Sequence, residues 1–380
     1  MKILIASHYY LPYRSGMSEY AHLLAVGLQD RGHQVHVLTV NHTRRLPGQE
    51  ESEGILIDRV DIVARYSKGC LAPGFAPRLR ALSAGSDAVI LGAPSPDLLP
   101  CCLVVPAGKL ILTYHCDLDL GPGPLRRLVL ILYRLSLKLA LLRRPAVVVN
   151  SEDYVRRSFL RSYTGRLTAI PPPIKPLCRV DPAPLRHEWG LEGRKVVGFL
   201  GRLVTEKGLH VLLQAWDRVL QAHPSPILLL AGEGEQVAGG SELGSLQALA
   251  QRFGESVRIV GPIPEARLAE FYSLCDVFAF PSISPLESFG MAQVEAMRCG
   301  TPVVASDLPG VREPVQRTTM GLLARRGDSA SLADSLNRIL QSPATFRQPL
   351  ESIEQLFSLE KTARAYEALI EGRPAQARCR

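Results

Sequence analysis

The sequence predicts an α/β protein of two domains, each built on a parallel sheet. Its 380 residues exceed what one ordinary hydrophobic core holds, and a content of 46% apolar and 21% charged residues is typical of globular proteins. Short apolar segments alternate with glycine- or proline-marked loops and helical patterns, which is the order of a parallel sheet. Prolines concentrate at 171–173, 176, 182 and 184, so we expect a domain boundary at about 171–185.

In the first half, Lys2–Ser7 has the pattern of a buried strand, and a loop with Gly16 separates it from a leucine-rich helix that ends near Gly32. Further strands are predicted at 35–40, 87–91 and 110–114. A strand–helix–strand start implies a parallel sheet, whose ligands bind at the carboxyl ends of the strands. Gly16 and His115 follow such ends, although a plain turn and a structural histidine are the alternative interpretations.

Residues 125–144 combine an apolar helical pattern with basic side chains. Arg127, Arg134 and Lys138 recur at helical spacing, and charges inside the apolar run argue against a membrane-spanning helix. Residues 120–170 hold ten Arg or Lys against two acids. Two interpretations are open: a core helix with a solvated basic stripe, and an interfacial helix on an anionic membrane surface. The region lacks the interleaved aromatic residues expected of nucleic-acid binding.

The second half repeats a strand, a loop with glycine or proline, and a helix, with strands predicted at 196–200, 227–230 and 257–260. The first of these loops holds Arg202 and Lys207 between Gly201 and Gly208. A guanidinium and an ammonium group at a strand–helix junction suit a diphosphate, and a solvated loop is the alternative. The loops lack the complete G-x-G-x-x-G pattern of dinucleotide binding.

The stretch 276–310 is predicted to form a strand, a proline-marked loop, a helix from near Ser288, and a second strand. A helix N-terminus in such a unit suits a phosphate, because its N–H groups lack partners and its dipole end is positive. Glu287 is expected to open this helix, and Glu295 follows it at a separation of about 80° and about 12 Å along a helix. The two acids would then contact opposite ends of one elongated ligand.

In combination these segments resemble the retaining GT-B glycosyltransferases of family 4, also called glycosyl transferases group 1. In the second half the resemblance rests on GRLVTEKG (201–208), AGEGE (231–235), GPIPEARLAEFYSLCDVFAFPS (261–282), ESFGMAQVEAMRCGTPVVASDLPGVREPV (287–315) and GLLARRGDSASLADSLNRIL (321–340). In the first half it is looser and rests on the Gly16 loop, LTYHCD (112–117) and VVVNSEDYVRRSF (147–159). The family often has paired glycines where this chain has Gly16-Met17, and an Asn-Gly-Val-Asp type turn where it has PPPIK.

The resemblance implies a GT-B architecture of two Rossmann-like domains that face each other across a cleft. Residues 1–172 would form the acceptor-side domain, residues 173–185 a proline-rich hinge, and residues 186–358 the nucleotide-sugar domain. A closing helix at 359–371 would return to pack on the first domain.

The resemblance also implies roles for single residues. Arg202 and Lys207 would hold the donor diphosphate, and Glu287 would bind hydroxyls of the donor sugar. Glu295 would bind the ribose, and His115 would contact the sugar near the reacting carbon. The family pattern assigns backbone contacts with the donor phosphates to Gly16, Phe289 and Gly290, and it places Gly201 among the donor-binding residues.

The implied reaction moves a sugar from a nucleotide sugar, such as a UDP- or GDP-sugar, to a glycan or lipid-linked acceptor with retention of anomeric configuration. Neither a cofactor nor a metal is implied, and Asp117 and Asp119, a D-x-D pair, are a weak metal signal because such pairs arise by chance. A sugar-nucleotide epimerase, an NAD-dependent oxidoreductase and a non-catalytic nucleotide-sugar-binding protein are the alternatives.

Charge and cysteine content suggest where the protein acts. A net charge of +8 favours an anionic partner. Eight cysteines without a paired CxxC framework, and a start without the pattern of a signal peptide, favour a reduced, cytoplasmic protein. We expect it in the cytoplasm, with a peripheral position on the cytoplasmic membrane face if 125–144 contacts lipid.

Overall fold

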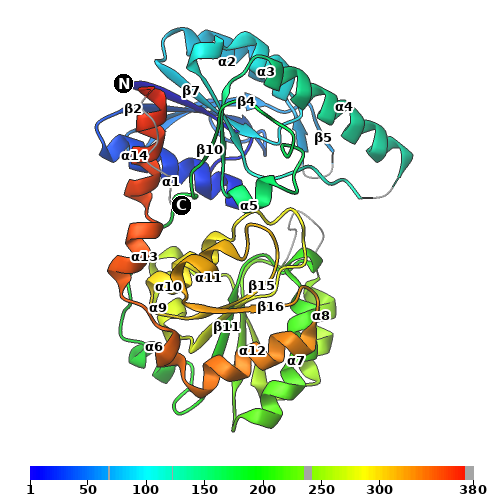
Figure 1. The fold of residues 1–380 in the computed structure, drawn as a ribbon, viewed down its shortest axis with the longest axis vertical. Coiled ribbons are helices and arrows are strands. Elements are labelled where there is room, and N and C mark those ends of the chain that lie inside the picture. Colours follow the sequence, from blue (N-terminus) through cyan, green and yellow to red (C-terminus); the bar gives the residue numbers. More distant parts are fainter. Residues whose placement is uncertain (67–68, 122, 235–241, 373–380) are drawn as a thin grey trace. The chain divides into compact units, whose positions relative to one another are not determined.

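A computed structural model describes residues 1–66, 69–121, 123–234 and 242–372, and it divides into two compact units (Figure 1). The first unit contains Met1–Pro173 together with the segment that begins at Leu359, and the second contains Ile174–Ser358. Glu235, at the end of the AGEGE motif, and Cys379 lie outside the described residues. The other seven cysteines are free thiols.

The first unit is built on an eight-stranded sheet in the order β10-β9-β8-β7-β1-β2-β4-β3, parallel except where β3 pairs with β4. Its strands are β1 (Lys2–Ala6), β2 (Gln34–Asn41), β3 (Gln49–Ser52), β4 (Ile55–Asp61), β7 (Ala88–Ala93), β8 (Leu110–Tyr114), β9 (Ala146–Val149) and β10 (Leu167–Ala169). Strands β5 (Ala64–Tyr66) and β6 (Gly69–Leu71) form a separate hairpin. Central strands such as β7 and β8 are buried along their whole length, which is why their sequences are nearly continuous apolar runs.

Helices cover both faces of this sheet (Figure 1). One face carries α2 (Phe75–Ala84), α3 (Leu98–Val104) and α4 (Pro124–Leu142), and the other carries α1 (Gly16–Asp30) and α14 (Leu359–Ile370). The short helices α5 (Glu152–Val155) and η1 (Ala107–Lys109) complete the unit. Helix α1 begins with a capping box in which Ser15 and Ser18 exchange side-chain and backbone hydrogen bonds.

The C-terminal helix α14 packs closely on α1 in the first unit. A Cβ atom at Gly27 would lie 2.9 Å from Leu359 Cδ1 and 3.2 Å from Ala363 Cβ, so glycine lets the two helices pack this closely without a shift of these side chains. The Tyr366 hydroxyl lies 2.8 Å from both Tyr20 Oη and Thr113 Oγ1 in the buried layer between the helices and the sheet. Burial and these contacts tie the last described helix to the first half of the chain.

The second unit is built on a six-stranded parallel sheet in the order β13-β12-β11-β14-β15-β16. Its strands are β11 (Val196–Leu200), β12 (Ile227–Ala231), β13 (Val257–Gly261), β14 (Val277–Phe280), β15 (Val303–Ser306) and β16 (Gly321–Ala324). Its helices are α6 (Ala183–Glu188), α7 (Leu209–Ala222), α8 (Leu243–Gln251), α9 (Leu268–Leu274), α10 (Met291–Arg298), α11 (Glu313–Thr318), α12 (Ser329–Gln341) and α13 (Leu350–Leu356), with 3₁₀ turns η2 (Thr205–Lys207), η3 (Gly254–Ser256), η4 (Glu265–Arg267) and η5 (Pro343–Phe346). These two sheets with helices on both faces confirm the predicted α/β fold class.

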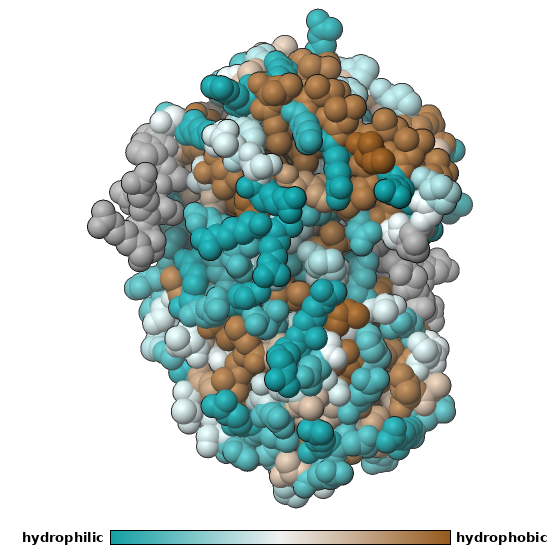
Figure 2. Space-filling model, turned by 45° about the vertical axis from the view of Figure 1, so that its right-hand side comes forward, coloured by the Kyte–Doolittle hydropathy of each residue, from teal (hydrophilic) through white to brown (hydrophobic). Residues whose placement is uncertain are grey.

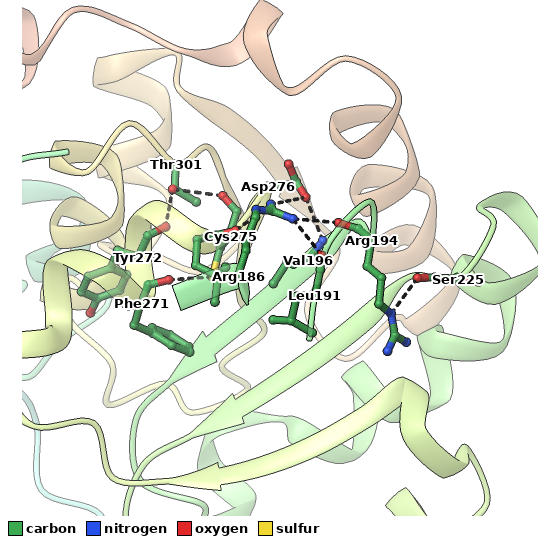
Figure 3. Close-up of polar contacts among 11 residues, drawn as sticks. Arg186, Leu191, Arg194, Val196, Ser225, Phe271, Tyr272, Cys275, Asp276 and Thr301 are labelled. Atoms are coloured by element: carbon green, nitrogen blue, oxygen red, sulfur yellow. Dashed lines mark hydrogen bonds and ion pairs between the residues drawn. The ribbon is translucent and has the colours of Figure 1, made fainter. Parts of the chain in front are cut away.

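The proline-rich segment that we expected as a hinge, 173–185, packs into the second unit from Ile174 onward. Ile174 and Leu185 are buried in that unit's core, because the prolines stop regular structure without preventing apolar contact. The Arg186 guanidinium then donates to the carbonyl oxygens of Arg194 and Leu274, and it pairs with Asp276 at 3.3 Å (Figure 3). Helix α6 is thereby held against the amino ends of β11 and β14.

Candidate active site

The strand order of the second unit creates a topological switch point between β11 and β14. From β11 the chain runs outward to β12 and β13, and it then returns to β14 on the other side of β11. Loops leave the carboxyl ends of β11 and β14 in opposite directions, and in open parallel sheets such a divergence is where ligands bind. Arg202 and Lys207 follow β11, and Glu287 follows β14.

The two loops at this switch point are bonded to each other. Lys207 Nζ donates a hydrogen bond to Glu287 Oε2 at 2.5 Å, and both side chains are about one fifth exposed. Lys207 Nζ also lies 5.1 Å from the centre of the Phe280 ring, over the last residue of β14. The Glu206 carbonyl accepts hydrogen bonds from Ser282 Oγ and from the Ile283 amide. The positions of the cation and the acid therefore depend on each other.

Two glycines bracket the β11 loop. Gly208 has φ +68° and caps α7, and a Cβ atom there would lie 2.1 Å from the Pro281 carbonyl oxygen. Gly201 directly follows β11 and begins the turn that carries Arg202. The Arg202 guanidinium, about one third exposed, reaches Glu206 at 3.8 Å. Lys207 is thus held in place by Glu287, whereas Arg202, in the same loop, has the more exposed side chain.

The expectation that Glu287 opens a helix is wrong. Helix α10 begins at Met291, and Gly290 before it has φ +83°, a left-handed conformation in which the helix cannot continue backward. Glu287 instead lies in the connecting loop, where its amide bonds to the Ser284 carbonyl oxygen. The helical separation of about 80° and about 12 Å therefore does not apply to Glu287 and Glu295. Phe289 turns inward and packs on Phe357 in the core.

Glu295 is held inside α10 by a buried tyrosine. Tyr272 Oη on α9 donates a hydrogen bond of 2.7 Å to Glu295 Oε2, and Glu295 is 7% exposed. Burial, and then the Glu295 carboxylate, raise the pKa of Tyr272 well above its usual value, so this hydroxyl stays protonated as a donor. The carboxylate is thereby oriented by a neighbouring helix.

In the first unit the corresponding switch point lies between β1 and β7. Gly16 is the first residue of α1, which leads away from β1, and a Cβ atom there would meet nothing within 4 Å. His115 follows β8, and its amide bonds to the Ala93 carbonyl oxygen at the end of β7. Its ring packs edge-on against Tyr20. Burial lowers the pKa of His115 to about 4, so the imidazole is neutral at physiological pH.

Sequence reasoning missed a close contact between a histidine and a carboxylate at the same edge. His8, which follows β1, places Nε2 2.6 Å from Asp97 Oδ1, and Ser95 Oγ donates to that oxygen at 2.5 Å. Burial raises the pKa of Asp97, but the hydrogen bonds from His8 and Ser95 outweigh it and leave the pKa below its usual value. His8 and Asp97 follow the adjacent parallel strands β1 and β7. The rule that ligands bind at the carboxyl ends of parallel strands, which made His115 a candidate, would therefore have made His8 a candidate as well.

The D-x-D segment has a structural role at Asp117. Its carboxylate accepts hydrogen bonds from the Tyr114 hydroxyl and from the Phe159 amide, and its own amide donates to Tyr154 Oη. Among the described residues, no group of three or more His, Cys, Asp or Glu side chains is placed to hold a metal ion.

The sequence-predicted residues fall into two groups. The second unit brings Lys207 and Glu287 into contact and places Arg202 in the same loop as Lys207, while Glu295 sits in the core-facing part of α10. Gly16 and His115 belong to the first unit, where they follow β1 and β8, two strands that are separated in the sheet by β7. Each group lies at the carboxyl edge of its own parallel sheet.

Two family models match the chain, one in each unit. The glycosyl transferase 4-like domain matches residues 15–173, and the glycosyl transferases group 1 domain matches residues 184–355. The chain therefore belongs to the GT-B glycosyltransferases of family 4.

Comparisons with individual proteins agree with this family. The chain is 37% identical over 207 residues to a D-inositol 3-phosphate glycosyltransferase of Corynebacterium jeikeium, a match that covers 51% of this chain and 48% of the relative. It is 39% identical over 149 residues to a phosphatidyl-myo-inositol mannosyltransferase of Mycobacterium leprae, which covers 39% of this chain and 38% of that one. The matched part thus spans about half or less of the length of these curated relatives.

Solved structures resemble the whole chain. Sucrose-phosphate synthase from Thermosynechococcus elongatus superposes with a TM-score of 0.78 at 25% identity and covers 98% of both chains. Anabaena HepE in complex with UDP-glucose superposes with a TM-score of 0.72 at 21% identity and covers 98% of this chain and 100% of its own. These likenesses establish the GT-B fold over the full described length.

Proposed function

We propose that this protein is a retaining glycosyltransferase, which moves a sugar from a nucleotide-sugar donor to an acceptor hydroxyl. The observation that carries the proposal is the contact between Lys207 and Glu287 at the β11–β14 switch point. It places a cation suited to a phosphate beside a carboxylate suited to sugar hydroxyls, at the edge of the sheet where ligands bind. Both are positioned by loops that pack on each other.

In this proposal the donor diphosphate binds at the β11 loop. Arg202 offers a fork of N–H donors and Lys207 a compact positive charge, and both would stabilise the negative charge that grows on the phosphate as the sugar leaves. Gly201 would let the backbone approach the phosphates, and the amides of Phe289 and Gly290 would donate to them from the β14 loop. This assignment uses the protein's own cations, so we propose metal-independent transfer without a cofactor.

The two acids are assigned to the two ends of the donor. Glu287 would accept hydrogen bonds from the hydroxyls of the sugar while it orients Lys207. Glu295, which is oriented by Tyr272, would accept hydrogen bonds from the hydroxyls of the ribose. In the first unit, His115 would contact the sugar near the reacting carbon with its neutral ring, and Gly16 would admit a phosphate to the start of α1.

Sugar transfer passes through an oxocarbenium-like state, in which the bond to the phosphate is largely broken. No carboxylate is assigned as a nucleophile. The leaving phosphate, held by Arg202 and Lys207, would accept the proton of the acceptor hydroxyl on the same face of the sugar. Departure and attack on one face retain the anomeric configuration.

The acceptor is proposed to be a glycan or a lipid-linked polyol at or near a membrane. The relatives carry inositol phosphate and phosphatidyl-myo-inositol in their names, which supports a hydroxyl-rich, phosphorylated acceptor. We propose a cytoplasmic location, where nucleotide sugars are the donors and the free thiols stay reduced.

Thermal unfolding against a panel of UDP- and GDP-sugars tests the donor assignment. A donor present at 100 times its dissociation constant adds about 2.7 kcal/mol to the free energy of unfolding. The matched controls are free glucose and NAD, which should add nothing. Stabilisation by NAD with nicotinamide turnover would instead indicate an oxidoreductase.

Turnover assays with the stabilising donor separate the remaining alternatives. Release of nucleoside diphosphate together with a new glycoside, whose anomeric coupling by NMR matches that of the donor, is the expected result. Conversion of the donor to its epimer would indicate an epimerase, and binding without any turnover would indicate a sensor. A product of inverted configuration would contradict the proposed mechanism.

A further inference from the structure

Helix α4 has an outer face that is unusually apolar for a solvent-facing helix. Its inner side, with Tyr133, Leu137 and Ala140, is buried against the first unit's core. Seven of the thirteen large apolar side chains that are exposed in the described residues lie on this one helix, each between 42% and 75% exposed: Leu125, Leu128, Ile131, Leu132, Leu135, Leu139 and Leu142. A helix that is apolar on both sides is expected to have something covering its outer face.

The exposed side chains of α4 divide into an apolar arc and a basic stripe. At 100° per residue the seven leucine and isoleucine side chains occupy an arc of about 120°, and Arg127, Arg134 and Lys138 occupy an adjacent strip of about 40°. No Asp or Glu occurs between Pro124 and Leu142. Figure 2, turned so that the side of α4 in Figure 1 comes forward, shows a broad hydrophobic area crossed by hydrophilic side chains at the top of the view.

The basic stripe continues onto a neighbouring segment. The Arg134 guanidinium stacks 4.1 Å from the centre of the Phe159 ring, which brings residues 156–161 alongside the helix. Arg156, Arg157 and Arg161 in that segment are exposed. At the start of α4, Arg126 and Arg127 line an open hollow together with Leu128 and Ile131. Positive charge therefore borders the apolar arc on its side and at its end.

The apolar arc and the basic stripe together indicate which kind of surface covers α4. A second copy of the chain, meeting it through the same face about a two-fold axis, would bring two basic stripes of a chain of net charge +8 together. On an anionic lipid surface, the leucine side chains would be buried among the acyl chains, and the basic stripe would lie against the negatively charged headgroups. The described helices do not include one that is long and apolar enough to span a bilayer.

We propose that α4 is an interfacial membrane anchor, which lies in the plane of an anionic bilayer with its apolar arc at the level of the acyl chains. Arg127, Arg134 and Lys138 face the phospholipid headgroups at the edge of the arc. Of the two interpretations that the sequence leaves open for 125–144, this proposal favours the interfacial helix over the core helix with a solvated basic stripe. It does not depend on sugar transfer, so its test needs no donor or acceptor.

Co-sedimentation with vesicles, at low and at high salt, tests the anchor on the full chain. Vesicles of phosphatidylcholine alone are compared with vesicles that also contain phosphatidylglycerol. We expect binding to the anionic vesicles that weakens as salt rises, since headgroup attraction is screened while apolar insertion is not. Absence of binding at both salt concentrations would overturn the proposal.

Two variants separate the apolar and the electrostatic contributions. The triple change Leu128→Gln, Leu135→Gln and Leu142→Gln removes the centre of the apolar arc with little change in helix propensity, and it should lower vesicle partitioning at least about tenfold at either salt. Its matched control replaces the exposed Leu71, Leu103 and Leu249 by Gln and should bind like the parent chain.

The double change Arg127→Gln and Lys138→Gln removes two stripe charges, and at low salt it should lower partitioning to anionic vesicles about tenfold or more. Its control, Arg218→Gln with Arg326→Gln, makes the same change in net charge at exposed positions of the second unit. Circular dichroism checks that each variant is folded. Unchanged binding of the folded triple variant would overturn the proposal. The proposal would also be overturned if the parent chain did not bind vesicles and light scattering showed it to be a dimer that the triple change dissociates.

Discussion

Lys207 Nζ and Glu287 Oε2 are 2.5 Å apart although 80 residues separate them in the chain. Their loops leave the neighbouring strands β11 and β14, and sheet pairing is what brings the two side chains together. An ammonium group held in this way keeps its place when a negatively charged ligand arrives, so less conformational freedom is lost on binding. The pair links the fold of the second unit to its proposed chemistry.

Replacing Lys207 by Ala should lower kcat/KM for sugar transfer about 100- to 1,000-fold, because a positioned charge that stabilises the leaving phosphate is lost. Steady-state kinetics with the stabilising donor measure the loss. The matched control is Arg252→Ala, which breaks an exposed ion pair with Asp217 on the same unit and should leave kcat/KM unchanged.

Replacing Glu287 by Ala should abolish detectable transfer while the chain stays folded, since the acid both orients Lys207 and contacts the donor sugar in the proposed site. Activity is measured together with circular dichroism and thermal unfolding. A folded Glu287→Ala protein that keeps the activity of the parent chain would sink the assignment of this site.

Gly208→Ala should destabilise the protein far more than Gly190→Ala. Both glycines have left-handed backbones, with φ +68° and φ +63°, so each substitution carries a backbone strain of about 1–2 kcal/mol. At Gly208 the new methyl group also meets the Pro281 carbonyl oxygen, whereas at Gly190 nothing lies within 4 Å. Urea unfolding should show at least about 2 kcal/mol more loss at Gly208. Equal losses would mean that the β11 and β14 loops are not packed as the structure shows.

Tyr272→Phe should weaken nucleotide binding by removing the hydrogen bond that orients Glu295. The free energy of unfolding should also fall by about 1–3 kcal/mol, because a buried carboxylate loses a partner. Calorimetric titration with the nucleoside diphosphate of the stabilising donor measures the affinity. The control is Tyr163→Phe, whose half-buried hydroxyl bonds to the Pro145 carbonyl oxygen in the other unit. Unchanged affinity in Tyr272→Phe would separate Glu295 from the ribose site.

The stability of the protein should fall as the pH drops from about 6.5 to about 4. Burial lowers the pKa of both His115 and His42 from 6.5 to about 4, so in this window the unfolded chain binds protons that the folded chain does not. Each histidine contributes a loss on the order of 3 kcal/mol, complete near pH 4. His115→Gln should remove its share of the difference in unfolding free energy between pH 7 and pH 4.5. His187→Gln, at an exposed ring, should remove none of it.

Local sequence carries the parts of this fold that depend on neighbouring residues. Mostly apolar runs such as 110–114 and 196–200 predict β8 and β11 because a strand buried on both faces needs a nearly continuous apolar segment. Glycines such as Gly208 mark turns by their backbone freedom, and cations after a strand end indicate an anion site. The motifs that flank Arg202 and Glu287 are similarly local, so the family is recognisable without coordinates.

Tertiary structure decided what depends on residues far apart in the chain. Whether β11 pairs with β14 is set by contacts across 80 residues, and this pairing alone brings Lys207 to Glu287. Glu287 lies outside α10 because Gly290 adopts a left-handed backbone against Phe280, a contact that helical periodicity does not encode. The buried Tyr272–Glu295 pair and the His8–Asp97 pair arise in the same way. The sequence by itself determined the order of strands, loops and reactive side chains, and only packing determined which of them meet.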